Sequence, residues 1–225
     1  MAAANDVKLI GMWASPYTLR PRIALNIKSV GYEFLEETLG QKSELLLKSN
    51  PVHKKMPVLV HRGRPLSESL VIVQYIDEVW SSGRAILPED AYERATARFW
   101  AAYIDDRWFP SLTGIAKAQG EEAKKAALAQ VHDGLGLLEG AFEEISKGKP
   151  FFGGDRIGYL DLALGCFLGS IKVSEALNNV KVLDEEKTPG LAKWAERFRA
   201  DEAAKDVVPD TERLVEFVKS MFAKK

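Results

Sequence analysis

Residues 50–69, NPVHKKMPVLVHRGRPLSES, carry the strongest signal for the fold. A lysine pair precedes Met56-Pro57, and a short apolar run then reaches the turn residues Arg62-Gly63-Arg64. Apolar pieces on both sides of such a turn predict a tight β-hairpin over residues 58–66. The acidic-hydroxyl pair Glu68-Ser69 comes next and begins an apolar segment with helical spacing, so we expect a helix directly after the hairpin.

The residues upstream of the hairpin alternate between strand-like and helix-like pieces. Val7–Met12 is short and apolar, as expected for a strand, and Pro16 suits the first position of a helix. Together with the hairpin, these pieces predict the order β-α-β-α-β-β-α, a small α/β layer structure. The remaining expected elements are a strand at Tyr32–Glu36, a short helix at Ser43–Lys48 and a helix at Glu68–Val79.

The composition changes at residues 81–90, SSGRAILPED, and the chain after them has helical periodicity almost throughout. Apolar residues between Leu128 and Ile145 recur at alternating spacings of three and four, which predicts an amphipathic helix. The stretch from Leu160 to Ile171 is apolar nearly all round and predicts one buried helix. We therefore expect an α/β domain at residues 1–80, a linker at 81–90 and an all-α domain at 91–225.

The bulk composition of the 225 residues excludes several classes of protein. A net charge of −1 gives no overall field for nucleic acid or for an anionic membrane. No apolar run approaches the ~18 residues of a membrane span, and the first residues lack the pattern of a signal peptide. The single cysteine, Cys166, allows no intramolecular disulfide. These features together lead us to expect a cytosolic protein. We expect no metal site, because no Cys or His spacing suits one.

Several motifs follow one another in a fixed order along the chain. The first part contains WASPY at 13–17, KSELL at 42–46, NPVHKKMPVL at 50–59 and ESLVIVQYIDE at 68–78. The second part contains ARFWAAYID at 97–105, FFGGD at 151–155 and TPGLAKW at 188–194. Over its whole length the chain resembles the plant tau class of cytosolic glutathione transferases. This resemblance implies a thioredoxin-like, glutathione-binding domain followed by an all-helical domain with a hydrophobic acceptor site.

The resemblance also implies roles for six residues, with glutathione as a co-substrate and no permanently bound cofactor. Ser15 would be the catalytic hydroxyl, donating to the glutathione sulfur. Lys42 and Lys55 would hold the glycine carboxylate, and Met56 would pair with the cysteinyl backbone because Pro57 is cis. Glu68 would accept from the ammonium group, and Ser69 would bind the γ-glutamyl carboxylate at a helix N-terminus.

Plainer structural roles compete with these assignments. Ser15 could instead cap the helix that Pro16 begins, and Tyr17 is a second hydroxyl nearby whose alternative role is aromatic packing. Glu68 and Ser69 could simply begin a helix that Ser67 caps. Asp161 resembles an acidic residue of a helix capping box, but Gly158 stands where Ser or Thr is expected, so we interpret Asp161 as structural.

The resemblance places the electrophile between Ser15 and the second domain and the protein in a homodimer. Glu78 and either Arg94 or Arg98 are candidate charges at the dimer interface, with ordinary solvated charges as the alternative. Core packing is the alternative for each aromatic of the acceptor site. The candidate acceptor residues are Met12, Trp13, Tyr17, Trp108, Phe109, Leu112, Thr113, Ala116, Phe217 and Met221.

Three functions remain open from the sequence. The first is conjugation of the glutathione thiolate to hydrophobic electrophiles in detoxification or stress, with hydroperoxide reduction as a compatible side activity. The second is a ligandin, a carrier of hydrophobic metabolites. The third is a thiol-disulfide or dehydroascorbate reductase, but relatives of that kind use a cysteine at the position of Ser15. Cys166 falls in the apolar segment and is expected to be a packing residue.

Overall fold

The structure is a computed structural model that describes residues 6–222. Its contacts divide the chain into two compact units. The first unit contains the chain up to Leu87 together with Glu202–Val208, and the second contains Pro88–Asp201 and the chain from Pro209 onward. The first boundary falls within the expected linker. No sequence signal indicated that Glu202–Val208 packs with the first unit, where the Asn26 side-chain amide donates to the Ala203 carbonyl at 2.9 Å.

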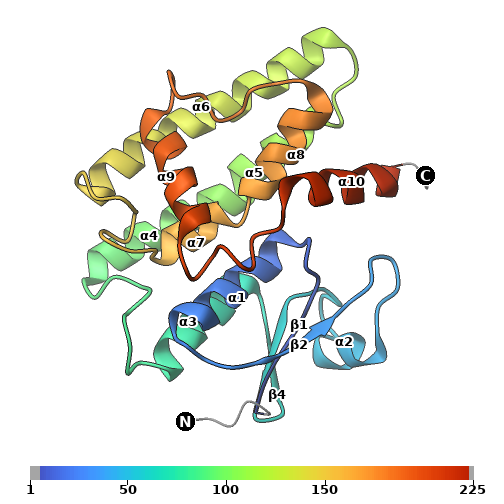
Figure 1. Ribbon diagram of the computed structural model, residues 1–225, viewed down its shortest axis with the longest axis vertical. Helices are drawn as coiled ribbons and strands as arrows, with labels where there is room; N and C mark the ends of the chain where they lie inside the picture. Colours follow the sequence, from blue (N-terminus) through green and yellow to red (C-terminus); the bar gives the residue numbers. More distant parts are fainter. Residues whose placement is uncertain (1–5, 223–225) are drawn as a thin grey trace. The chain divides into compact units, whose positions relative to one another are not determined.

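The first unit is an α/β layer structure in the predicted order (Figure 1). Its sheet has the strand order β2-β1-β3-β4. Strands β1 and β2 are parallel, and the other two pairings are antiparallel. The elements are β1 (Val7–Gly11), α1 (Pro16–Ile27), β2 (Glu33–Glu36), α2 (Glu44–Ser49), β3 (Val58–His61), β4 (Arg64–Ser67) and α3 (Ser69–Val79).

The two faces of this sheet are covered by different helices. Ile10 and Val58 are cross-strand neighbours, and they form a buried cluster with Leu46 of α2. Side chains alternate along a strand, so the neighbouring pair Leu9 and Leu59 faces the other side. There α1 and α3 pack against each other, as Figure 1 shows. The core of the first unit therefore lies on both faces of a four-stranded sheet.

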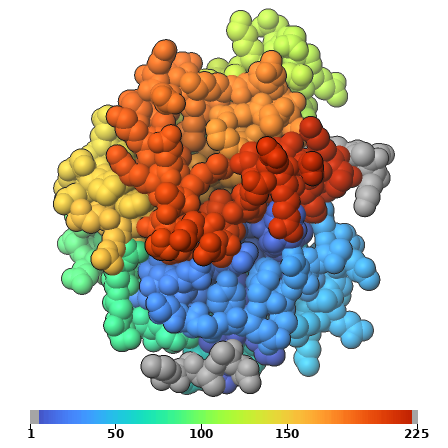
Figure 2. All heavy atoms as spheres, in the orientation of Figure 1, coloured from blue at the N-terminus to red at the C-terminus, as the bar shows by residue number. Residues whose placement is uncertain are grey.

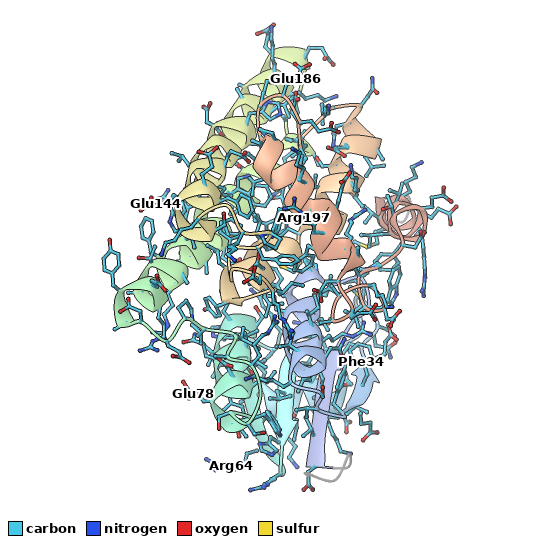
Figure 3. The ribbon with its side chains drawn as sticks, turned by 60° about the vertical axis from the view of Figure 1, so that its left-hand side comes forward. Phe34, Arg64, Glu78, Glu144, Glu186 and Arg197 are labelled. Atoms are coloured by element: carbon cyan, nitrogen blue, oxygen red, sulfur yellow. The ribbon has the colours of Figure 1, made fainter. Side chains whose placement is uncertain are left out.

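Two glycines are required by the geometry of the first unit. Arg62 and Gly63 form the turn of the predicted hairpin with φ values of 51° and 73°. Two successive positive φ values match the twist of a hairpin, and glycine adopts one without steric cost. Figure 3 shows Arg64 at this end of the sheet. At the other end, a Cβ atom on Gly11 would lie 2.3 Å from the Thr18 methyl group, so β1 and α1 meet too closely for a side chain.

The second unit is helical, as predicted. Helix α10 packs on α8, and the two lie side by side in Figures 1 and 2. A π-helical turn, η2, connects α4 to α5. The elements are α4 (Ala91–Tyr103), η2 (Ile104–Trp108), α5 (Phe109–Ile115), α6 (Glu121–Ser146), α7 (Tyr159–Gly165), α8 (Leu168–Asn178), α9 (Pro189–Ala200) and α10 (Thr211–Phe222).

The prediction of one helix from Leu160 to Ile171 is wrong. Helix α7 ends at Gly165, and α8 begins at Leu168 after a turn in which the Phe167 N–H donates to the Leu164 carbonyl at 3.0 Å. A Cβ atom on Gly165 would lie 2.3 Å from the Phe198 ring, and the Phe167 ring stacks on Phe109 with 3.9 Å between centroids. Both sides of the turn are buried, so hydrophobic periodicity could not reveal the break.

Asp161 anchors the start of α7 from a fully buried position. Its carboxylate accepts hydrogen bonds from the N–H groups of Phe152, Gly153 and Gly158 at 2.8–2.9 Å and from the Trp194 indole at 2.7 Å. Burial raises its pKa to about 6, and these hydrogen bonds oppose the rise. The predicted structural role is confirmed. Only half of a capping box forms, because Gly158 has no side chain to return the bond.

Candidate functional site

Ser15 occupies the N-cap position of α1 without using its hydroxyl as a cap. Its backbone is extended, its N–H donates to the Met12 carbonyl at 3.0 Å, and its carbonyl accepts from the Thr18 N–H at 3.0 Å. The side chain is half-buried and forms no capping hydrogen bond. The structure therefore does not support the capping role of the Ser15 side chain, and the hydroxyl can serve as a donor to a ligand.

Tyr17, the second hydroxyl near the start of α1, has an aromatic contact of its own. The Arg20 guanidinium lies 5.3 Å from the centre of the Tyr17 ring. That distance is within the range of a cation–π interaction. This contact is of the packing kind that we expected as the alternative to a donor role.

The loop before β3 is organised by a residue that sequence reasoning missed. Asn50 is buried, its Oδ1 accepts from the His53 N–H at 3.1 Å, and its Nδ2 donates to the Lys55 carbonyl at 2.8 Å. The Lys55 side chain points into solvent, and the following peptide bond, Met56-Pro57, is cis as expected. An Asn after a short helix was a weak turn signal, and it could have suggested this role.

The start of α3 combines an unusual backbone with a buried cation. Glu68 has φ 74° and ψ 111°, and it, not Ser67, is the N-cap residue. Its exposed carboxylate lies 3.8 Å from the His53 imidazole Nε2. Ser69 is the first helical residue, and its Oγ accepts from Nη1 of the fully buried Arg20 at 3.1 Å. Arg20 is the second residue missed from sequence, because a charged residue on a helix is normally exposed.

Strand register brings the segments that carry the six predicted glutathione residues to one edge of the sheet. Gly11 pairs with Glu36, so the turn that leads to Ser15 and the loop that leads to Lys42 leave the sheet at the same edge. Ile10 pairs with Val58, which places Lys55 and Met56 beside the end of β1. Val58 pairs with Ser67, so Glu68 and Ser69 follow at this edge. Four separate segments thus supply cationic, anionic, hydroxyl and backbone groups to one place.

The candidate acceptor residues differ in exposure. In the first unit, Met12 is buried, and Trp13 and Tyr17 are half-buried. In the second unit, Trp108 and Leu112 are buried, and the Trp108 indole packs beside Gly134 and Phe167 in the core. The more accessible candidates in that unit are Phe109, Thr113, Ala116, Phe217 and Met221.

The candidate interface charges lie on two helices. Glu78 is exposed on α3, as Figure 3 shows, and Arg98 is exposed on α4. Arg94 instead donates to the backbone carbonyls of Pro88 and Glu89 at 3.1 and 3.4 Å.

Within residues 6–222 there is no cluster of three or more potential metal ligands. Nor does that part of the chain contain a helix with the length and apolar character needed to cross a bilayer.

Two family models match the chain. "Glutathione S-transferase, N-terminal domain" matches residues 5–78, and "Glutathione S-transferase, C-terminal domain" matches residues 95–202. The chain belongs to the glutathione S-transferase family. The predicted fold class, a thioredoxin-like domain followed by a helical domain, is thereby confirmed.

Relatives of known name place the chain within the tau class. It is 63% identical to glutathione S-transferase U17 of Arabidopsis thaliana, an alignment that covers 99% of this chain and 98% of the relative. A tau-class glutathione S-transferase from mango, Mangifera indica, is 66% identical with a TM-score of 0.95, covering 96% and 99% of the two chains. A rice glutathione transferase in complex with glutathione is 38% identical with a TM-score of 0.89, covering 99% and 100%. The predicted resemblance to the plant tau class is confirmed.

Proposed function

We propose that the chain is a glutathione S-transferase that joins the glutathione thiolate to hydrophobic electrophiles. The observation that carries the proposal is the convergence of four segments at one sheet edge beside a hydroxyl that caps nothing. Named relatives at more than 60% identity are transferases, which favours this activity over the ligandin alternative. The rice relative was solved in complex with glutathione, which supports glutathione as the co-substrate.

Each part of glutathione has a candidate partner in this arrangement. The γ-glutamyl carboxylate would bind the N–H groups at the start of α3 and the Ser69 hydroxyl, because a helix N-terminus favours an anion. The adjacent ammonium group would bind Glu68. The cysteinyl backbone would pair with Met56 in the manner of an added strand. The glycine carboxylate would lie near Lys42 and Lys55, whose side chains are exposed.

Ser15 would perform the chemical activation. A free thiol with a pKa near ~8.5 is only slightly ionised at neutral pH. Lowering the thiol pKa by two units requires about 2.7 kcal/mol of preferential thiolate stabilisation. A hydroxyl donor next to the N-terminus of α1 can contribute to this, because both the hydrogen bond and the helix dipole favour the anion. The thiolate then attacks the electrophilic carbon and displaces its leaving group.

The acceptor site, the homodimer and the cytosolic location belong to the same proposal. The accessible acceptor candidates named above would contact the electrophile, and buried Trp108 and Leu112 would support them from the core of their unit. For the dimer, support comes from exposed apolar side chains at Tyr92 and Phe99 of α4. For the cytosol, support comes from Cys166, which is a buried free thiol.

A panel of co-substrates tests the proposal. We expect the purified protein to conjugate glutathione to a chlorinated nitroaromatic, followed by the absorbance of the thioether product. Stoichiometric binding of hydrophobic ligands without turnover of any electrophile would instead favour the carrier. Reduction of dehydroascorbate at a rate comparable to conjugation would contradict the role of Ser15, because no cysteine occupies that position. Hydroperoxide reduction by bound glutathione would be compatible with the proposal.

A further inference from the structure

Glu37 is a buried acid that the proposed mechanism has not used. It follows β2 directly, and the residue is 6% exposed. Its N–H donates to the Gly11 carbonyl at 2.7 Å, which fixes its backbone to the end of β1. The carboxylate therefore sits where the loop toward Lys42 leaves the sheet.

Both oxygens of the Glu37 carboxylate bind a single residue, Ser43. Oε2 accepts from the Ser43 N–H at 3.0 Å, and Oε1 accepts from the Ser43 hydroxyl. The same hydroxyl oxygen accepts from the Leu46 N–H at 3.0 Å, so Ser43 also caps α2. A buried carboxylate needs such donors to offset its lost hydration. Glu37 thus closes the loop of residues 37–43, and through Ser43 it also fixes the start of α2.

Lys42 lies inside this closed loop, immediately before the anchored residue. On its other side, a turn is closed by the Gln41 N–H, which donates to the Thr38 carbonyl at 3.2 Å, with Gly40 at φ 85°. The main chain of Lys42 is therefore held from both directions, while its side chain is exposed. Within residues 6–222, no acidic side chain forms an ion pair with the Lys42 ammonium group. The cation is positioned by its backbone and not by a side-chain partner.

We propose that Glu37 is a positioning residue for the glycine end of glutathione, acting through Ser43 to hold Lys42 at the carboxylate. This inference rests on the proposed function. Its physical basis is preorganisation: a loop already ordered in the free protein does not lose conformational freedom when the ligand binds. The Gly11 contact also joins this loop to the strand that ends at the Ser15 turn. Glu37 therefore connects the loop proposed to bind the glycine carboxylate of glutathione to the strand that leads to Ser15, which is proposed to bind its thiol.

Glu37→Gln is the direct test, because it keeps the size of the side chain and replaces one acceptor oxygen with a donor group. We expect the KM for glutathione to rise roughly tenfold, since the amide NH2 faces a donor of Ser43 and the loop loses its anchor. The kcat and the KM for the electrophile should change less than about twofold, because Glu37 does not contact the reacting groups. Glu33→Gln, an exposed acid on β2 paired with Lys8, is the matched control and should behave as wild type.

Glutathione amide, in which the glycine carboxylate is neutral, separates positioning from general structural damage. If Glu37 acts through Lys42, the ratio of variant to wild-type KM should fall close to one with the amide as co-substrate. The double variant Glu37→Gln, Lys42→Ala should have the same KM for glutathione as Lys42→Ala alone. Equal KM ratios with glutathione and its amide, or additive effects in the double variant, would overturn the inference.

Three further results complete the test. If Glu37→Gln does not fold, Ser43→Ala is the alternative, because it removes the hydrogen bond of the hydroxyl and leaves that of the N–H group. Its KM for glutathione should rise several-fold, and its KM for glutathione amide should stay close to that of wild type. A different result would separate the two proposals. If Lys42→Ala changes the KM for glutathione more than the KM for its amide, but neither Glu37→Gln nor Ser43→Ala does so, Glu37 has no positioning role and the proposed function stands. If wild type conjugates no electrophile, the proposed function itself fails.

Discussion

Arg20 and Ser69 are joined by a hydrogen bond inside the first unit, with 3.1 Å between Nη1 and Oγ. Both side chains are buried, and Arg20 has no exposed surface. A guanidinium can only donate, so the Ser69 oxygen is the acceptor and its own hydrogen is directed elsewhere. This arrangement leaves the Ser69 hydroxyl oriented as a donor at the first residue of α3, and it places a positive charge close behind the helix end where we propose that the γ-glutamyl carboxylate binds.

Arg20→Met should therefore weaken glutathione binding. The variant no longer orients the Ser69 hydroxyl or places a positive charge behind the start of α3, and a resulting loss of about 1–2 kcal/mol in binding corresponds to a KM for glutathione roughly 5- to 30-fold higher. The KM for the electrophile should change much less. Steady-state kinetics with each substrate varied in turn measures both constants. The exposed Arg62→Met is the control, and an Arg20→Met enzyme with wild-type KM for glutathione would contradict this assignment.

Local sequence signals predicted the first unit well. Alternating apolar residues, Pro16 and the Arg62-Gly63 turn are each short-range features, and they specify strands, a helix start and a hairpin independently of tertiary contacts. The glutathione roles of Glu68 and Ser69 rest on the long motif around them and stay predictions. The cis bond before Pro57 was expected only from the resemblance, and it is confirmed.

The features that sequence could not predict depend on long-range contacts. Arg20 is a charge on a helix, and nothing in its neighbours indicates that Ser69, 49 residues later, will bury it. Glu37 looks like a solvated acid until the loop brings Ser43 onto it. The break after Gly165 is set by Phe198 from another helix. In each case the deciding partner lies beyond the window in which periodicity operates.

Replacing Asp161 should destabilise the protein in a pH-dependent manner. The folded pKa of about 6 lies above the ordinary value of 3.8, so the folded chain binds this proton more tightly than the unfolded chain. Its contribution to stability is complete below pH ~4 and declines as the pH rises toward ~6, by roughly 3 kcal/mol. Asp161→Asn cannot accept the four hydrogen bonds, and it lacks this titration.

Urea denaturation of wild type and Asp161→Asn across this range measures the effect. We expect the variant to be less stable by about 4 kcal/mol near pH ~4, and this difference should shrink by roughly 3 kcal/mol, to about 1 kcal/mol, near pH ~7. The exposed Asp155→Asn is a control on the same segment. A stability difference that grows as the pH rises from ~4 to ~7 would have the opposite sign and would contradict the raised pKa.

Glu139 should contribute to stability by capping α9 from a distance. This buried carboxylate on α6 accepts from the N–H groups of Gly190 and Leu191 at 2.6 and 2.8 Å. Glu139→Gln keeps one acceptor and places a donor against the other N–H, so we expect a loss of about 1–2 kcal/mol in the free energy of unfolding. The exposed Glu143→Gln on the same helix should change it by less than ~0.5 kcal/mol. Equal stability of the two variants in urea would refute the cap.

We expect the Ser15 hydroxyl to stabilise the thiolate of bound glutathione. Titrating the ultraviolet absorbance of the thiolate in the complex measures the thiol pKa directly, and Tyr17→Phe serves as the control for the other nearby hydroxyl. We predict a bound thiol pKa well below the free value of ~8.5 in wild type and Tyr17→Phe, and a return toward the free value in Ser15→Ala, with turnover falling in parallel. A Ser15→Ala protein that keeps both the wild-type thiol pKa and the wild-type turnover would contradict the claim.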